Sequence, residues 1–316
     1  MSPSGRPPPS SLPDSRPPRA PGVSASALAT AGLLLVTAIW GSTFFLIKDV
    51  VDRMPVTDFL ALRFLLAAVV LFTIAPFSAV RLSAQARRQG FALGAVYGAG
   101  QILQTVGLQH TAASVSGFIT GMYVVFTPLL AAVVLRQRVG MAAWVAVTLA
   151  TAGFGVLSVQ GFALGGGEAL TLLSALCYAV HIIGLGAWSS SRDAMGLAVV
   201  QMATIAVLCG LAAVPGGVTL PPDGTAWFGV AYTALGAGAL ALVVQTWSQA
   251  QLSATRAAVI MTMEPVFAGL FAVSLGGEMV TVRLALGGAL VLAAMYLVEL
   301  GPRRGADSAV PHLSAP

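Results

Sequence analysis

The sequence has very little charge. Only 9% of its 316 residues are Asp, Glu, Lys or Arg, whereas 57% are hydrophobic and the mean hydropathy is +0.88. A soluble domain has about a quarter of its residues charged, so this chain cannot cover its own surface with polar groups. Lipid must cover it instead. The composition therefore predicts an integral membrane protein.

Further absences exclude classes of function. Cys177 and Cys209 are the two cysteines, and both lie in apolar segments without the spacing of a metal site or a disulfide framework. No G-x-x-x-x-G-K-[ST] motif is present, so ATP-driven pumping by this chain is not expected. His110, His181 and His312 share no motif with acidic residues, which argues against a lipid-modifying membrane enzyme. We expect no cofactor and no bound metal.

Apolar runs of about 17–25 residues predict membrane-spanning helices. They lie near 27–47, 59–77, 91–108, 112–135, 141–159, 168–188, 195–214, 226–247, 255–275 and 281–300. Residues 1–24 are rich in Pro, Ser and Arg and predict a disordered tail, and 301–316 form a second tail. No A-x-A-like site follows the first run, so it is predicted to be a retained helix rather than a signal peptide.

The basic residues predict the orientation, because Lys and Arg accumulate in cytoplasmic loops. With the N-terminus inside, 12 of the 16 basic residues fall on the cytoplasmic side, Lys48, Arg53 and Arg283 fall outside, and Arg63 lies within the second span. We therefore predict a multi-pass protein of the inner (plasma) membrane with both termini in the cytoplasm. Its basic balance follows from this rule and from contact with anionic lipid, so no nucleic-acid partner is expected. Monomer and homodimer are both left open.

The chain also contains an internal repeat, which shows when the sequence is compared with itself. At an offset of 141 the matched pairs are Gln104 with Gln245, Thr105 with Thr246 and Ala113 with Ala254; at an offset of 138 they are Trp40 with Tyr178 and Arg63 with Gln201. Because five spans per half is an odd number, the halves must cross the membrane in opposite senses. The predicted fold is all-α, with ten transmembrane helices in two inverted five-helix repeats, 27–159 and 168–300.

Several segments resemble one known family. They are "AIWGSTFFLIK" (38–48), "LRFLLAA" (62–68), "SVSGFITGMYVVFTPLLAAVVLRQRV" (114–139) and "SATRAAVIMTMEPVFAGLFAVSLGGEMV" (253–280). The chain is similar here to EamA-type transporters of the drug/metabolite transporter superfamily. The resemblance covers about 27–300 and implies a ten-helix carrier, often an exporter of amino acids or other small metabolites. One departure is Gln137, where the family pattern commonly has Glu; its repeat partner is Glu278.

Glu264 is the first candidate for the transport site. It lies about nine residues into the ninth span, roughly 13 Å along the helix and near mid-bilayer. An acid there must be paired or face a polar cavity, and desolvation favours its neutral form, which makes it a candidate proton carrier. Pro265 leaves the carbonyl of Met261 without its helical donor. The alternative is a structural role, in which Glu264 binds backbone donors of a bent helix. The repeat aligns Glu264 with Tyr123.

The other candidates each have a structural alternative. Gln104 and Gln245 either tie helices together or contact the solute. Arg63 is expected to snorkel outward or to pair with Asp58, with an anionic solute as the alternative. The remaining candidates for the site are His181, Trp40, Ser42 and Tyr178. His181 is expected to be a hydrogen-bonded core residue, and the other three either line an aromatic wall or pack.

These observations predict a secondary transporter. It would move a small organic metabolite, amino acid-like or drug-like, through the cytoplasmic membrane by alternating access, outward, with protons as the candidate coupling ion. A non-transporting membrane sensor is the second alternative besides the lipid-modifying enzyme, although the loops are too short to hold a sensing domain. The GxxxG pattern "GFITG" (117–121) predicts a close approach between helices.

Overall fold

The computed structural model describes residues 25–134, 141–160, 163–252, 257 and 260–300, and its regular secondary structure is helical apart from one two-residue ladder. The first half contains α1 (Ala25–Val51), α2 (Val56–Ile74), α3 (Ala84–Gln109), α4 (Ala113–Thr120), α5 (Tyr123–Val134) and α6 (Met141–Ser158). A short antiparallel ladder of β1 (Val159–Gln160) and β2 (Ala163–Leu164) then leads to the second half. The predicted tails, together with Gln137 and Ala254, lie outside the described residues.

The second half begins with two long helices. Its elements are α7 (Gly166–Trp188), α8 (Ala194–Ala213), the 3-10 turn η1 (Val214–Gly216), α9 (Gly224–Tyr232), the π-helical η2 (Thr233–Leu240), α10 (Ala241–Gln249), α12 (Met263–Ser274) and α13 (Val282–Leu300). Elements α9, η2 and α10 follow one another without a gap and make one continuous rod. The eighth predicted span therefore contains a segment of widened helix.

Two predicted spans are broken rather than continuous. The fourth span divides into α4 and α5 at Gly121 and Met122, and α12 begins at Met263 directly after the turn residue Thr262. These breaks fall at equivalent positions, because Gly121 and Thr262 are 141 residues apart, the offset of the repeat. Pro265 lies in the first turn of α12, where backbone N–H groups have no acceptor within the helix. The N–H that proline lacks therefore costs α12 no hydrogen bond. Pro265 thus helps to begin a helix rather than to bend one.

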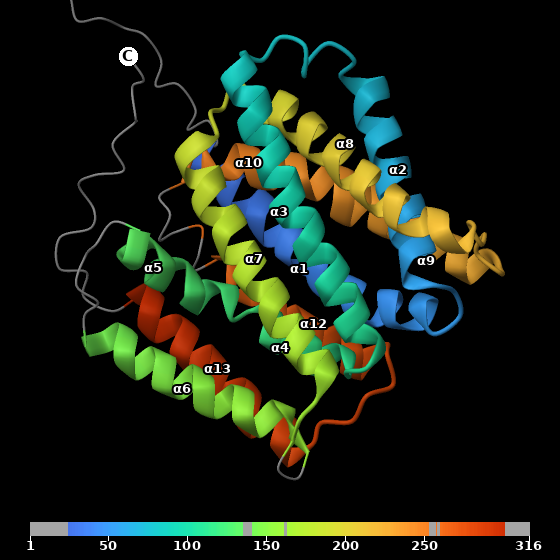
Figure 1. The fold of residues 1–316 in the computed structure, drawn as a ribbon. Helices are drawn as coiled ribbons and strands as arrows, with labels where there is room; N and C mark the ends of the chain where they lie inside the picture. The colour runs from blue at the N-terminus through green and yellow to red at the C-terminus, as the bar shows by residue number, and fades with distance from the viewer. Residues whose placement is uncertain (1–24, 135–140, 161–162, 253–256, 258–259, 301–316) are drawn as a thin grey trace, which may run out of the picture.

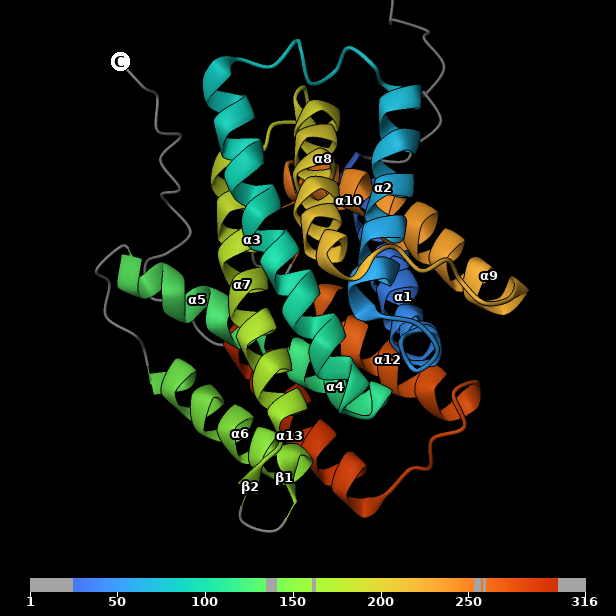
Figure 2. The ribbon, with the colours of Figure 1, turned by 45° about the vertical axis from the view of Figure 1, so that its right-hand side comes forward.

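The helices pack in pairs that recur between the halves (Figures 1 and 2). Helices α2 and α8 pack together on one side of the molecule, and α6 and α13 pack together on the opposite side. Between these pairs, α3 packs on α7, and the equivalent helices α10 and α1 pack together in the same way. Likewise α12 packs on α1, and α4 and α5 pack on α7. This arrangement places the two broken helices next to each other at the centre, where α4 contacts α12.

Exposure is distributed as lipid requires. Large apolar side chains such as Leu35, Leu65 and Val69 face outward, while polar side chains such as Gln201, Gln245 and Thr246 are buried. Seven helices in the described residues are long and apolar enough to cross a membrane, and three shorter apolar helices accompany them. Because a soluble protein would bury the apolar side chains and expose the polar ones, the chain is a multi-pass membrane protein.

A carboxylate from a distant loop caps α4. Gly277 has a φ of 72°, a left-handed conformation that suits glycine, and it turns the chain after α12. The next residue, Glu278, accepts the backbone N–H of Ala113 at 2.7 Å and also hydrogen-bonds the Ser114 hydroxyl. These contacts satisfy donors that the first turn of a helix leaves free, and the negative charge suits the helix dipole. Glu278 therefore joins the two halves.

Removal of this cap is expected to destabilise the protein. Glu278→Ala should lower the free energy of unfolding by about 0.5–2 kcal/mol, as the loss of an N-cap does, whereas Glu278→Gln should keep part of that stability through its amide oxygen. Thermal unfolding of the purified protein in detergent would compare the two variants. Equal melting temperatures for Glu278→Ala and wild type would show that the contact contributes nothing.

A second loop carries charged contacts at the end of α1. Asp223 accepts the backbone N–H of Ala226 at 2.9 Å and so caps α9, and Arg53 donates to the same carboxylate at 2.5 Å. The Ala226 N–H and the Arg53 guanidinium hold the pKa of Asp223 below its ordinary value. Its stabilising contribution is therefore complete at neutral pH and is lost only as the pH falls through that lowered value. This exposed pair fixes the loop before α9 without governing the stability of the membrane part.

Candidate functional site

A cavity of about 480 Å³ lies where the broken helices meet the long ones. Helices of both halves contribute to it, and polar and aromatic side chains dominate its wall. The lining residues are Trp40, Thr43, Phe44, Ile47, Arg63, Tyr97, Gln101, Gln104, Tyr123, Tyr178, His181, Ile182, Gln245, Met261 and Glu264. The volume of about 480 Å³ counts all space between the atoms, including open solvent; about 40 Å³ of it admits the centre of a water-sized sphere, which is room for a few water molecules in this conformation. Every predicted candidate except Ser42 lines this cavity.

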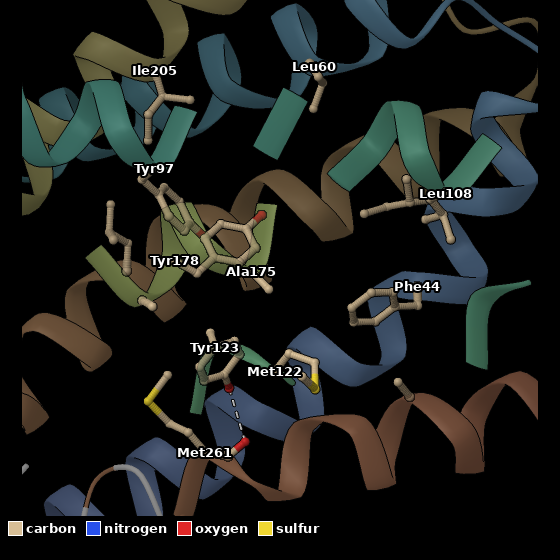
Figure 3. Close-up of a cluster of buried hydrophobic side chains, with 14 of the residues drawn as sticks. Phe44, Leu60, Tyr97, Leu108, Met122, Tyr123, Ala175, Tyr178, Ile205 and Met261 are labelled. Atoms are coloured by element: carbon tan, nitrogen blue, oxygen red, sulfur yellow. Dashed lines mark hydrogen bonds between the residues drawn. The ribbon is translucent and has the colours of Figure 1, made fainter. Parts of the chain in front are cut away.

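Glu264 and Tyr123 join the two halves across the cavity. The Tyr123 hydroxyl lies 2.8 Å from a carboxylate oxygen of Glu264 and 3.2 Å from the carbonyl oxygen of Met261. Figure 3 shows the hydroxyl directed at that carbonyl, which lies four residues before Pro265 and cannot accept a backbone N–H from it. Tyr123 is the first residue of α5 and Glu264 the second of α12. Two equivalent helix N-termini therefore meet at one hydrogen-bonded pair.

The phenol has one proton and two neighbouring acceptors. An ionised Glu264 accepts a hydrogen bond from the phenol, and the Met261 carbonyl then receives none from Tyr123. A neutral Glu264 can donate its own proton to the phenol oxygen, and the phenol is then free to donate to Met261. Protonation of Glu264 therefore changes which backbone atom is satisfied at the start of α12.

The two repeat-related glutamines differ in their partners. Gln104 donates to the Thr120 hydroxyl at 3.0 Å and accepts from the Tyr178 hydroxyl at 2.9 Å, so it ties α3 to α4 and α7. Gln245 is equally buried, but its side-chain oxygen has no hydrogen-bond partner among the described residues. A buried acceptor without a donor is costly. Gln104 thus ties three helices together and also lines the cavity, whereas the buried side-chain oxygen of Gln245 has no donor among the described residues.

The side chains of Trp40 and Ser42 have partners on different elements, although the two residues are close together on α1. The Trp40 indole N–H donates to the carbonyl of Ala237 at 3.0 Å, a residue in the π-helical η2. The wider turns of a π-helix leave carbonyls available, so this bond fixes the indole at the cavity wall. Ser42 instead lies 2.7 Å from the Tyr232 hydroxyl, on the side of α1 that faces α9. The prediction that Ser42 lines the site is wrong in placement.

Comparisons with known proteins agree on one family. The model of the EamA-like transporter family matches residues 27–159 and 165–300. The chain belongs to this family. An "Uncharacterized transporter" of Archaeoglobus fulgidus is 34% identical to this EamA-like chain over 273 residues, which is 86% of each protein. A solved crystal structure superposes with a TM-score of 0.63 at 18% identity, covering 87% of this chain and 97% of its own; it supports the fold alone.

In this EamA-like protein Arg63 is buried rather than snorkelled. It is 2% exposed, and its guanidinium lies 4.8 Å from the ring centre of Phe64. It does not pair with Asp58, whose carboxylate accepts the backbone N–H of Thr219 at 2.9 Å instead. Both predicted outcomes are corrected: α2 turns this side chain toward the cavity, where aromatic rings and amides surround it.

His181 and Tyr178 lie on the α7 side of the same cavity. The His181 ring nitrogen is 2.7 Å from the Gln201 side-chain oxygen, and its ring stacks on Tyr97 with centres 4.8 Å apart. Tyr97 also lies beside Tyr178 (Figure 3), and their ring centres are 5.5 Å apart. The hydrogen-bonded His181 agrees with the core role expected for it, although one edge reaches the cavity.

Some lining residues were missed by the sequence reasoning. Tyr97 and Gln101 lie on α3 at a spacing of four, and Gln104 follows three residues later. This spacing puts all three on one helix face. The predicted role of Gln104 could therefore have been extended along that face to the other two.

Proposed function

We propose that the chain is a secondary carrier of a small organic solute in the plasma membrane, with export as its direction. Its ten spans would form two inverted five-helix repeats that rock about the central cavity and expose it to each side in turn. Protons are the proposed coupling ion, and Glu264 is the proposed site of coupling. Both termini would lie in the cytoplasm.

The observation that carries this proposal is the position of the cavity. It lies between the halves, at two helix breaks that are 141 residues apart, and residues of both halves line it. Helices broken at equivalent points near the midplane are typical of the sites of inverted-repeat carriers. The recurrent helix pairs, such as α2 with α8 and α3 with α7, each join one half to the other, so the cavity lies within the packed interface between the halves. Family membership points to transport rather than to catalysis.

Analysis of exported compounds tests the proposal. Medium from cells that overproduce the wild type, Glu264→Gln or an empty vector would be compared by untargeted mass spectrometry, with equal membrane levels of both proteins. We expect at least one small organic compound to accumulate outside only with the wild type. Equal export by Glu264→Gln would keep the carrier and reduce Glu264 to a structural role. Flux of that compound in reconstituted vesicles would then separate transport from an indirect effect; its absence there would contradict the proposal.

A further inference from the structure

Arg63 is a buried cation that has no counter-ion among the residues that the structure describes. Its Nη1 donates to the Gln101 side-chain oxygen at 3.4 Å, and its Nε is buried without a hydrogen-bond partner. The ion pairs found in the described residues involve Lys48 and Arg53, and Arg63 takes part in none of them. A buried charge in this state is unfavourable unless something else compensates it.

The protein groups around Arg63 do not supply that compensation. The rings of Phe59 and Phe64 contact the guanidinium at 5.9 and 4.8 Å from their centres, and these contacts are weak beside an ion pair. The long bond to Gln101 is to a neutral amide. Asp58 binds Thr219, and Glu264 binds Tyr123. Among the described residues no acid pairs with Arg63, and an anionic molecule in the cavity that Arg63 lines would supply the missing negative charge.

The geometry of the free edge indicates which anion fits. An arginine side chain presents its Nε–H and one terminal nitrogen side by side, and this pair matches the two oxygens of a carboxylate. In Arg63 the contact to Gln101 uses Nη1, and Nε is buried with no acceptor among the described residues, so a solute would reach this edge once the cavity wall moves. We propose that Arg63 is the carboxylate subsite of the transported solute.

A second unpaired group extends the description of the solute. The side-chain oxygen of Gln245 is also buried and lines the same cavity without a donor. A solute with a carboxylate and an N–H or O–H donor would satisfy both groups, while its apolar part would contact Trp40, Phe44 and Ile47. The inference rests on the proposed transport function, because it assigns a class of solute to that cavity.

Two variants test whether Arg63 acts in binding or in structure. The unliganded protein is costly to fold around an uncompensated cation, so Arg63→Met should raise its melting temperature in detergent by a few degrees. Arg53→Gln, which removes an exposed arginine at the membrane surface, is the matched control and should leave the ligand response unchanged. A lower melting temperature for Arg63→Met than for wild type would make Arg63 a structural residue and overturn the proposal.

Matched ligands test the chemical class. The probes are phenylacetate and phenylacetamide, and phenylalanine and phenylalaninamide, measured as stabilisation of the purified full chain against heat. Each carboxylate should stabilise the wild type at lower concentration than its amide. Arg63→Gln should weaken carboxylate binding by about 10- to 100-fold, and Arg63→Lys, which keeps the charge but not the paired donors, by less.

The contrary outcomes separate this inference from the transport function. Equal stabilisation by carboxylates and amides, or equal stabilisation by chloride, would overturn the carboxylate assignment. Unimpaired vesicle flux of a carboxylate solute in Arg63→Gln would keep the carrier but remove the subsite. Binding that depends on Arg63, without flux of the bound compound in vesicles, would keep the subsite and contradict transport.

Discussion

Glu264→Gln is expected to uncouple transport from the proton gradient while the solute site stays intact. In vesicles with an imposed pH gradient, solute accumulation should fall by about tenfold, which is within the usual range of coupling energies between two sites. Exchange of labelled for unlabelled solute, which needs no proton movement, should change by less than about threefold. A pH-sensitive dye inside the vesicles would report whether protons still move with the solute.

The physical reason lies in the hydrogen bonds of Tyr123. A glutamine at 264 keeps the shape of the carboxyl group and can still bond the phenol 2.8 Å away, but it cannot gain or lose a proton. The switch of the Tyr123 hydrogen bond between Glu264 and the Met261 carbonyl is then no longer linked to protonation. Tyr123→Phe is the complementary variant, because it keeps the acid and removes the hydroxyl shared with Met261.

The controls decide between coupling and structure. Glu278→Gln removes an acid of the same kind that caps the N-terminal start of α4, outside the central cavity. It should leave gradient-driven accumulation unchanged. If Glu264→Gln lost exchange and accumulation to the same extent, Glu264 would serve binding or folding rather than coupling. If it kept gradient-driven accumulation, the proposed coupling site would be wrong.

Pattern and repeat together predicted much of the site. The offset of 141 paired Glu264 with Tyr123, and the structure brings these two side chains into one hydrogen bond. The bond itself was not predicted: an acid at mid-span beside Pro265 needs a polar partner or a polar cavity, and the repeat only marked Tyr123 as its equivalent position. The family and the membrane character followed from local sequence alone.

The face that each helix presents could not be predicted in the same way. Helix α2 is apolar on all sides, so periodicity gives no inward face, and Arg63 could have pointed to lipid or to the cavity. Ser42 failed for the same reason on α1. The break at Gly121 and Met122 depends on the packing of α4 against α12, and the π-helical turns of η2 depend on neighbours far away in sequence. Tertiary contacts determine helix orientation and helix breaks, and these contacts cannot be derived from the local pattern of one sequence.

Gly117→Ala is expected to be one of the most disruptive single-methyl changes in the protein. A Cβ at position 117 would lie 2.3 Å from the Cβ of Ala268 on α12, closer than two carbons can approach. Gly41 meets the same segment from α1, where a Cβ would lie 2.5 Å from that of Phe267. The two glycines let α1 and α4 contact α12 closely, as small residues do in lipid. Overpacking at such a contact costs about 1–3 kcal/mol of stability.

The expected result is a lower melting temperature and less folded protein in the membrane for Gly117→Ala. Gly210→Ala on α8 is the matched control, because its added Cβ meets no atom within 4 Å, and it should be neutral or slightly stabilising. Gly117→Ala also pushes α4 away from α12. Because α4 leads into Tyr123, the distance between Tyr123 and Glu264 should lengthen. Gly117→Ala should therefore impair both stability and proton coupling, whereas unchanged stability would show that α4 and α12 do not approach as closely as these distances require.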